Sequence, residues 1–81
     1  MRVRVRLFAS LREAVGTSEV ELDLPEGATA ETAWQQLAGA HAALAPRRAR
    51  LTAAVNRRYA LFDAPLHDGD EVVFVPPVSG G

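Results

Sequence analysis

The sequence predicts an α+β fold in which a mixed sheet of four to five strands packs on one main helix, as in a β-grasp roll. Three features predict it. Polar and apolar residues alternate over residues 2–8 and 19–24, as in strands with one buried face. An amphipathic helical segment follows Thr29. A nearly continuous apolar run at residues 71–75 indicates a central strand.

The size and composition are those of one small folded domain. The chain has 81 residues, 48% of them apolar, and a formal net charge of −1. This composition favours a folded chain over a disordered one, and the length supports one hydrophobic core. We expect a single domain over residues 1–75, followed by an extended tail over residues 76–81.

The first part of the chain predicts two strands with a short helix between them. Ser10 is the expected N-cap of a single helical turn, Glu13 occupies the capping-box position, and Gly16 ends the turn. Alternate side chains of the two strands should face the core. These side chains are Val3, Val5, Leu7, Val20, Leu22 and Leu24.

The main helix is predicted to begin at a threonine and to end before a proline. Thr29 is the expected N-cap, with Thr32 as a weaker alternative, and about ten to fifteen helical residues should follow. Pro46 must lie beyond the helix because it lacks an amide donor. Residues 47–50 would then form a connector, and Trp34 is expected in the core.

The last part of the chain predicts three further extended segments. Residues 51–55 form a strand, residues 56–58 a turn and residues 59–62 a short extended piece. The dipeptide Asp68-Gly69 marks the turn before the final strand. Because the first and last strands are both apolar on the helix side, we expect them to lie centrally and to run parallel.

Arginines occur in two groups, and we expect no nucleic-acid binding. The first group faces three acids of the second strand, so cross-strand pairs should cancel its field. The second group has no adjacent acidic stripe; a solvated surface is the commoner explanation, and contact with an acidic partner or anionic ligand is the alternative. The first group is Arg2, Arg4 and Arg6 opposite Glu19, Glu21 and Asp23, and the second is Arg47, Arg48, Arg50, Arg57 and Arg58.

The side chains used by most enzymes are missing or scattered. The chain has no cysteine, and His41 and His67 lack metal-ligand spacing, so we expect no metal site. A P-loop is absent, so ATP should not bind to this chain itself. No apolar run approaches the ~20 residues of a membrane span. The N-terminus does not resemble a signal peptide, which favours a cytoplasmic location without membrane contact.

The C-terminal segment is the strongest candidate for chemistry. Two terminal glycines leave a carboxylate on a backbone without side chains, which an enzyme can enclose closely. The two prolines stiffen the segment, and six extended residues span roughly 20 Å. These properties suit insertion into a partner's pocket. The tail consists of Pro76, Pro77, Val78, Ser79, Gly80 and Gly81.

A partner that takes up the tail also needs an apolar surface to contact. We predict that this surface lies on the side of the sheet away from the helix. The candidate interface residues are Phe8, Tyr59, Phe62, Val73 and Val75.

Four motifs carry a likeness to a known family. They are LFASLRE at residues 7–13, AVN at residues 54–56, LHDGDEV at residues 66–72 and PPVSGG at residues 76–81. With these motifs the chain resembles the small subunits of molybdopterin synthase, the MoaD family of ubiquitin-like sulfur carriers. The likeness covers essentially the whole chain, and its last two motifs are the most specific.

The resemblance implies that Gly81 is adenylylated and then thiocarboxylated by partner enzymes. An E1-like adenylyltransferase would use the ATP, and the chain itself would bind no cofactor. Sulfur would pass to cyclic pyranopterin monophosphate in molybdenum cofactor biosynthesis. The chain would act as a co-substrate, without catalytic side chains of its own, in a sulfurtransferase complex of two small and two large synthase subunits.

Other functions share the terminal Gly-Gly. Ubiquitin-like sulfur carriers for tRNA thiolation or thiamin have the same fold, and protein modifiers use such a terminus to join lysines of other proteins. A binding module with an incidental Gly-Gly is the third alternative, and it predicts that loss of the C-terminus has no effect.

Overall fold

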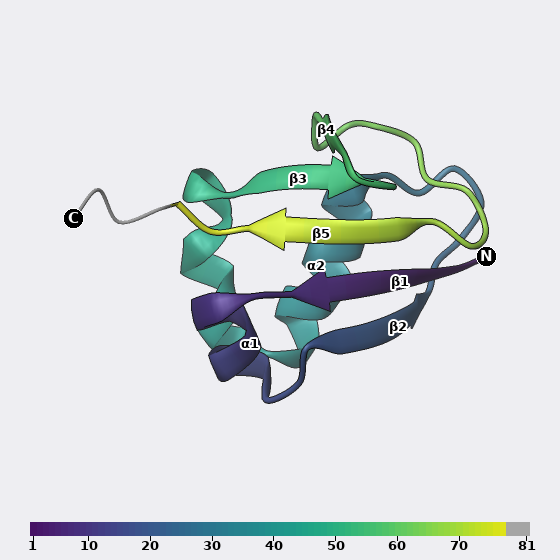
Figure 1. Cartoon of the computed structure of the whole chain (residues 1–81). Helices are drawn as coiled ribbons and strands as arrows, with labels where there is room; N and C mark the ends of the chain where they lie inside the picture. Colours follow the sequence, from purple (N-terminus) through teal and green to yellow (C-terminus); the bar gives the residue numbers. More distant parts are fainter. Residues whose placement is uncertain (78–81) are drawn as a thin grey trace.

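In a computed structural model that describes residues 1–77, five strands form one mixed sheet, and helices cover one of its faces (Figure 1). The strand order is β2-β1-β5-β3-β4. This arrangement confirms the predicted β-grasp fold. The elements are β1 (Arg2–Leu7), α1 (Ala9–Val15), β2 (Glu19–Asp23), α2 (Ala30–Ala40), the 3₁₀ helix η1 (Ala42–Arg50), β3 (Thr52–Val55), β4 (Arg58–Ala60) and β5 (Glu71–Val75).

The first and last strands are parallel neighbours near the middle of the sheet, as predicted. Leu7 of β1 is the Cα partner of Phe74 in β5, and β5 pairs on its other side with β3. The strictly alternating burial of β1 and β5 follows from this position, because one face of each strand meets the helices. The chain therefore enters its C-terminal tail from the central strand.

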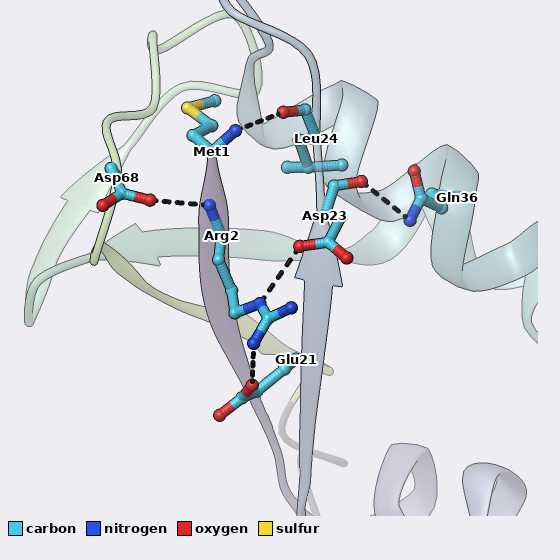
Figure 2. Close-up of polar contacts among 7 residues, drawn as sticks. All are labelled: Met1, Arg2, Glu21, Asp23, Leu24, Gln36 and Asp68. Carbon is cyan, nitrogen blue, oxygen red and sulfur yellow. Dashed lines mark hydrogen bonds and ion pairs between the residues drawn. The ribbon is translucent and has the colours of Figure 1, made fainter.

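Polar contacts connect the start of β1 to two other parts of the chain, residues 21–24 and the turn at Asp68 (Figure 2). The α-amino group of Met1 donates to the carbonyl oxygen of Leu24 at 2.8 Å, and the amide of Arg2 donates to Asp68 Oδ1 at 2.8 Å. The Arg2 guanidinium contacts Asp23 at 3.0 Å and Glu21 at 3.5 Å. These contacts lie at the opposite end of β1 from the tail.

Helix α1 begins two residues earlier than predicted. Phe8 is its N-cap and makes no side-chain capping bond, so the prediction that Ser10 caps the helix was wrong. Ser10 lies in the first turn because the buried Leu11 anchors the helix to the core. Gly16 ends the helix as predicted, with φ at 91° in the left-handed region and its amide bonded to the Arg12 carbonyl oxygen.

Helix α2 begins with a reciprocal capping box. The Thr29 hydroxyl accepts from the amide of Thr32 at 3.3 Å, and the Thr32 hydroxyl accepts from the amide of Thr29 at 3.0 Å. Thr29 is therefore the cap, as predicted, and Thr32 completes it. The helix ends at Ala40, before Pro46. The predicted connector at residues 47–50 is instead the end of η1, whose buried Leu44 packs into the core.

The turn between β3 and β4 is shorter than predicted. Only Asn56 and Arg57 form it, both with positive φ (51° and 69°), so Arg58 already pairs with Val55. Two central residues with positive φ are typical of the tight hairpin turn whose twist matches the strands.

The core lies between the sheet and the helices. Trp34 of α2 meets Phe74 of β5 edge to face, with ring centroids 5.1 Å apart. The inward residues predicted for β1 are buried, as are Leu22 and Leu24. Val20 is only partly buried because β2 is an edge strand of the sheet.

Candidate functional site

The tail leaves the sheet beside two helical elements. Figure 1 shows β5 ending at the same end of the sheet as α1. Pro76 is half-buried and Pro77 is exposed, and both line a groove of about 250 Å³. The other residues that line this groove are Ser10, Leu11, Pro46, Arg47, Arg50 and Leu51. The remaining predicted tail residues, Val78, Ser79, Gly80 and the reactive Gly81, lie outside the described residues.

The sheet face opposite the helices has an apolar centre. Cα pairing places Arg6, Val73, Ala54 and Tyr59 in one row across β1, β5, β3 and β4. Val73 is half-buried, and Tyr59 is 81% exposed. Since Val72 and Phe74 point into the core, the alternation of β5 turns Val73 outward as predicted.

A shallow groove of about 240 Å³ follows this apolar row. Its lining residues are Ala54, Arg57, Tyr59, Val73 and Val75. Three of the five predicted interface residues therefore lie together. Val75, the last residue of β5, lines this groove, so a partner that bound the face would lie close to the start of the tail.

Phe8 is the fourth predicted interface residue, and it is 46% exposed. It directly follows β1, and the Arg6 guanidinium carbon lies 5.8 Å from its ring centroid. Because Leu7 is the Cα partner of Phe74, Phe8 lies at the end of the sheet where β5 reaches Val75.

The prediction that Phe62 lies on the outer face was wrong. Its ring stacks on the buried Phe74 with centroids 5.9 Å apart, and its carbonyl oxygen accepts from the amide of Glu31 in α2 at 2.8 Å. The Arg48 guanidinium carbon lies 3.4 Å from the Phe62 ring centroid. Phe62 therefore packs on the helix side, where it extends the aromatic core.

The predicted interface did not include Leu61, which is 76% exposed, or the groove residues Ala54 and Arg57, although Arg57 was named in the second arginine group. The period-two pattern contained the signal for Leu61. Every second residue of an extended segment faces the same side, so Leu61 shares the outward side of Tyr59. Phe62 shares the opposite side with Ala60, which pairs with the buried Ala53.

The charges on the β1–β2 surface balance as predicted. The pairing register sets Arg2 opposite Asp23, Arg4 opposite Glu21 and Arg6 opposite Glu19. The hydrogen bond from Arg2 holds the pKa of the Asp23 carboxyl below its usual value, and the same bond raises the pKa of Arg2. In addition Arg6 approaches Glu71 at 3.7 Å.

In the second arginine group, Arg48 pairs with Glu31 at 2.6 Å. Its hydrogen bonds, followed by one from Gln35, hold the pKa of the Glu31 carboxyl below the usual value. Within residues 1–77, no cluster of three or more His, Cys, Asp or Glu side chains could hold a metal ion. The helices of that same part of the chain are too short or too polar to cross a membrane.

Known proteins resemble this chain over its whole length. It is 47% identical to the molybdopterin synthase sulfur carrier subunit of Escherichia coli (strain K12), over 98% of this chain and 99% of that one. The Chlamydomonas reinhardtii protein of the same name is 37% identical over 100% of both chains. The crystal structure of SAMP1 from Haloferax volcanii superposes with a TM-score of 0.91 at 32% identity, over 100% of both chains.

The family comparison covers nearly the whole chain. The model of the ThiS family matches residues 5–81, which includes all of the sheet except the first residues of β1, and also the C-terminal tail. The chain therefore belongs to the ThiS family.

Proposed function

We propose that this chain is the sulfur carrier subunit of a molybdopterin synthase and that the Gly81 carboxylate is its reactive group. The 47% identity to a carrier of that name supports the proposal. The observation that carries it is the exit of a Pro-Pro…Gly-Gly tail from the central strand, beside an exposed apolar face.

The chemistry follows from the nature of a carboxylate, which is a poor electrophile. A carboxylate oxygen of Gly81 attacks the α-phosphorus of ATP on an adenylating partner, which releases pyrophosphate and leaves an acyl-adenylate. Hydrosulfide (HS⁻) from a sulfur source then displaces AMP at the carbonyl carbon and leaves a thiocarboxylate. The thiocarboxylate sulfur forms a bond to a carbon of cyclic pyranopterin monophosphate on the large subunit, and water then cleaves the acyl–sulfur bond, which leaves the sulfur on the substrate and restores the carboxylate. The lack of cysteine is consistent with sulfur carried only at the terminus.

Two partners would use the same surface. We propose that the E1-like adenylyltransferase and the large synthase subunit each contact the outer face through Phe8, Tyr59, Val73 and Val75, so that they bind in turn. The complete synthase would contain two small and two large subunits and act in the cytoplasm. The state of the tail would decide the exchange: the thiocarboxylate form suits the synthase, and the free carboxylate form suits recharging.

The test is a change in intact mass. Incubation with the adenylyltransferase of the same organism, ATP and a sulfur source should add ~16 Da, because sulfur replaces one oxygen. A chain without Gly81 should gain no mass and should melt at the wild-type temperature. An unchanged wild-type mass with an active enzyme would contradict the proposal.

A second candidate is supported by the likeness to SAMP1, a protein named small archaeal modifier protein 1. In that role Gly81 would form an isopeptide bond with lysines of other proteins. All nine basic residues of this chain are arginine, so its own side chains would not be acceptors. Sulfur carriage for tRNA thiolation or thiamin is a further possibility within the ThiS family.

Purification from the native cell separates these functions. Recovery of the large synthase subunit with the chain would support the first proposal. Recovery of a tRNA-thiolating or thiamin-forming enzyme, or of Gly81 joined to lysine in tryptic peptides, would support the corresponding alternative.

A further inference from the structure

The groove at the base of the tail carries two arginines and no acidic residue. Arg47 and Arg50 line it together with Pro76 and Pro77. Within residues 1–77 neither arginine takes part in a salt bridge or a side-chain hydrogen bond. Their positive charge is therefore not neutralised by the part of the chain that the structure describes.

The 3₁₀ helix η1 carries both arginines, and Arg48, which lies between them in the sequence, holds this helix in place. Arg48 bonds to Glu31 of α2 at 2.6 Å and stacks on Phe62. The buried Leu44 fixes the other half of η1. Arg47 and Arg50 therefore project from a fixed backbone, which lowers the entropy lost when they bind a charged group.

The position of the groove determines what a partner must contact. Pro76 and Pro77 form part of its wall, so a protein that encloses the tail must bring the rim of its channel against Ser10, Arg47 or Arg50. A neutral or basic rim would remove water from the two guanidinium groups without replacing their hydrogen bonds, which is costly. Carboxylates on the rim would replace those bonds, because guanidinium and carboxylate form strong charge-assisted pairs.

We propose that this groove, which we call the arginine groove, receives an acidic segment at the rim of the adenylating enzyme's tail channel. The proposal rests on the proposed function, since it requires an enzyme that takes up the tail. The half-buried Leu51 would contact the aliphatic parts of that segment, while Arg47 and Arg50 pair with its carboxylates. These arginines would speed association and set the orientation of the carrier, so binding should weaken as salt screens the charges.

The experiment measures ATP–pyrophosphate exchange with the adenylating enzyme of the same organism, as a function of carrier concentration. The double variant Arg47→Glu/Arg50→Glu should raise the KM for the carrier ~10-fold or more, as expected for rim charges that face carboxylates, with little change in kcat. Its KM should also lose the salt dependence of the wild-type carrier. The charge-conserving Arg47→Lys/Arg50→Lys should stay within ~3-fold of wild type, because only the forked geometry is lost.

A matched control separates a local contact from a general charge effect. Arg50→Glu and Arg58→Glu make the same change in net charge at two exposed positions, but Arg58 lies in β4, outside the groove. Arg50→Glu should raise KM, and Arg58→Glu should change it less than ~2-fold at physiological salt. Thermal melting confirms that each variant is folded.

The possible failures are distinguishable. If wild-type carrier supports no exchange, the proposed function fails and this inference fails with it. If wild-type carrier is active but the double Glu variant keeps the wild-type KM at low salt, the inference alone is wrong; the groove would then bind nothing on this enzyme, or hold the chain's own C-terminus. Equal effects of Arg50→Glu and Arg58→Glu, or of the Lys and Glu double variants, would also overturn it.

Discussion

At the scale of single residues, the side chain of Arg48 connects three segments of the chain. Arg48 in η1 bonds to Glu31 in α2 and stacks on Phe62, which follows β4. The pair is only partly shielded, since the side chains of Arg48 and Glu31 are 34% and 37% exposed. Solvent screening therefore limits its contribution to stability.

We predict that Glu31→Gln lowers the free energy of unfolding at pH 7 by only about 0.5 kcal/mol, the range of a partly exposed ion pair. The folded-state pKa of Glu31 is lowered, so its contribution is present above the unfolded-state pKa and is lost as pH falls through the folded-state value. Urea unfolding should thus show a difference from wild type at pH 7 that shrinks below about pH 4, near the reference pKa of glutamate. Glu26→Gln, which removes the same charge at an exposed position, is the control.

At the scale of elements, Asn56 ties two turns together. Its side-chain oxygen accepts from the amide of Glu71 at 3.0 Å, and its side-chain nitrogen donates to Asp70 Oδ1 at 2.9 Å. Asp70 in turn accepts from the amide of His67 at 2.8 Å. The AVN and LHDGDEV motifs are therefore one structural unit, which fixes the start of β5 against the β3–β4 hairpin.

Two substitutions at Asn56 distinguish the contribution of its side-chain hydrogen bonds from that of its backbone conformation. Asn56→Gly keeps the positive φ but removes the side-chain bonds, and it should cost about 1–2 kcal/mol of unfolding free energy. Asn56→Ala removes the bonds and also strains the backbone, which should cost about 1 kcal/mol more. Denaturant titration of both variants measures the difference. Equal stabilities would mean that the left-handed conformation at Asn56 contributes nothing.

Burial alternates along β5, and this alternation leads to a second prediction at the scale of elements. Val75→Asp should leave the domain folded and weaken both the adenylyltransferase and the large-subunit complexes by about 2 kcal/mol or more, as for a buried interface residue. Val72→Asp, three residues earlier, should unfold the domain because Val72 is fully buried. Circular dichroism and binding titrations check both variants. Unfolding of Val75→Asp would place Val75 in the core, and loss of only one complex would contradict the shared surface.

At the scale of the whole molecule, the fold was predictable because its strands follow a simple pattern. Period-two alternation in β1, together with the nearly continuous apolar run of β5, predicted the core face and the parallel central pair. The η1 helix was not predictable from Pro46 alone, because a 3₁₀ turn can include a proline that would interrupt an α-helix. Phe62 was misplaced because its position depends on contacts with Phe74 and Arg48, which come from distant parts of the chain.

The candidate site was predictable to a lesser extent. The outward positions of Tyr59, Val73 and Val75 follow from strand alternation. The position of Pro76 and Pro77 at the start of the tail follows from their place directly after β5. The arginine groove was not predictable, because it forms only where α1, η1 and the tail meet. No local pattern in the sequence indicates that these three segments are neighbours.

Because β5 lies between β1 and β3, the sheet can form only in a chain that includes this last strand. In a nascent or truncated chain that lacks β5, only the two-stranded pairs β1–β2 and β3–β4 of the sheet remain, and an isolated pair of strands is marginally stable in water. Such a chain would expose unpaired strand edges and remain open to proteases. The apolar outer face, to which β5 contributes Val73 and Val75, therefore forms only in chains that have been synthesised through β5. A partner that recognised this face would not bind chains that end within or before β5 and so lack the C-terminal glycines.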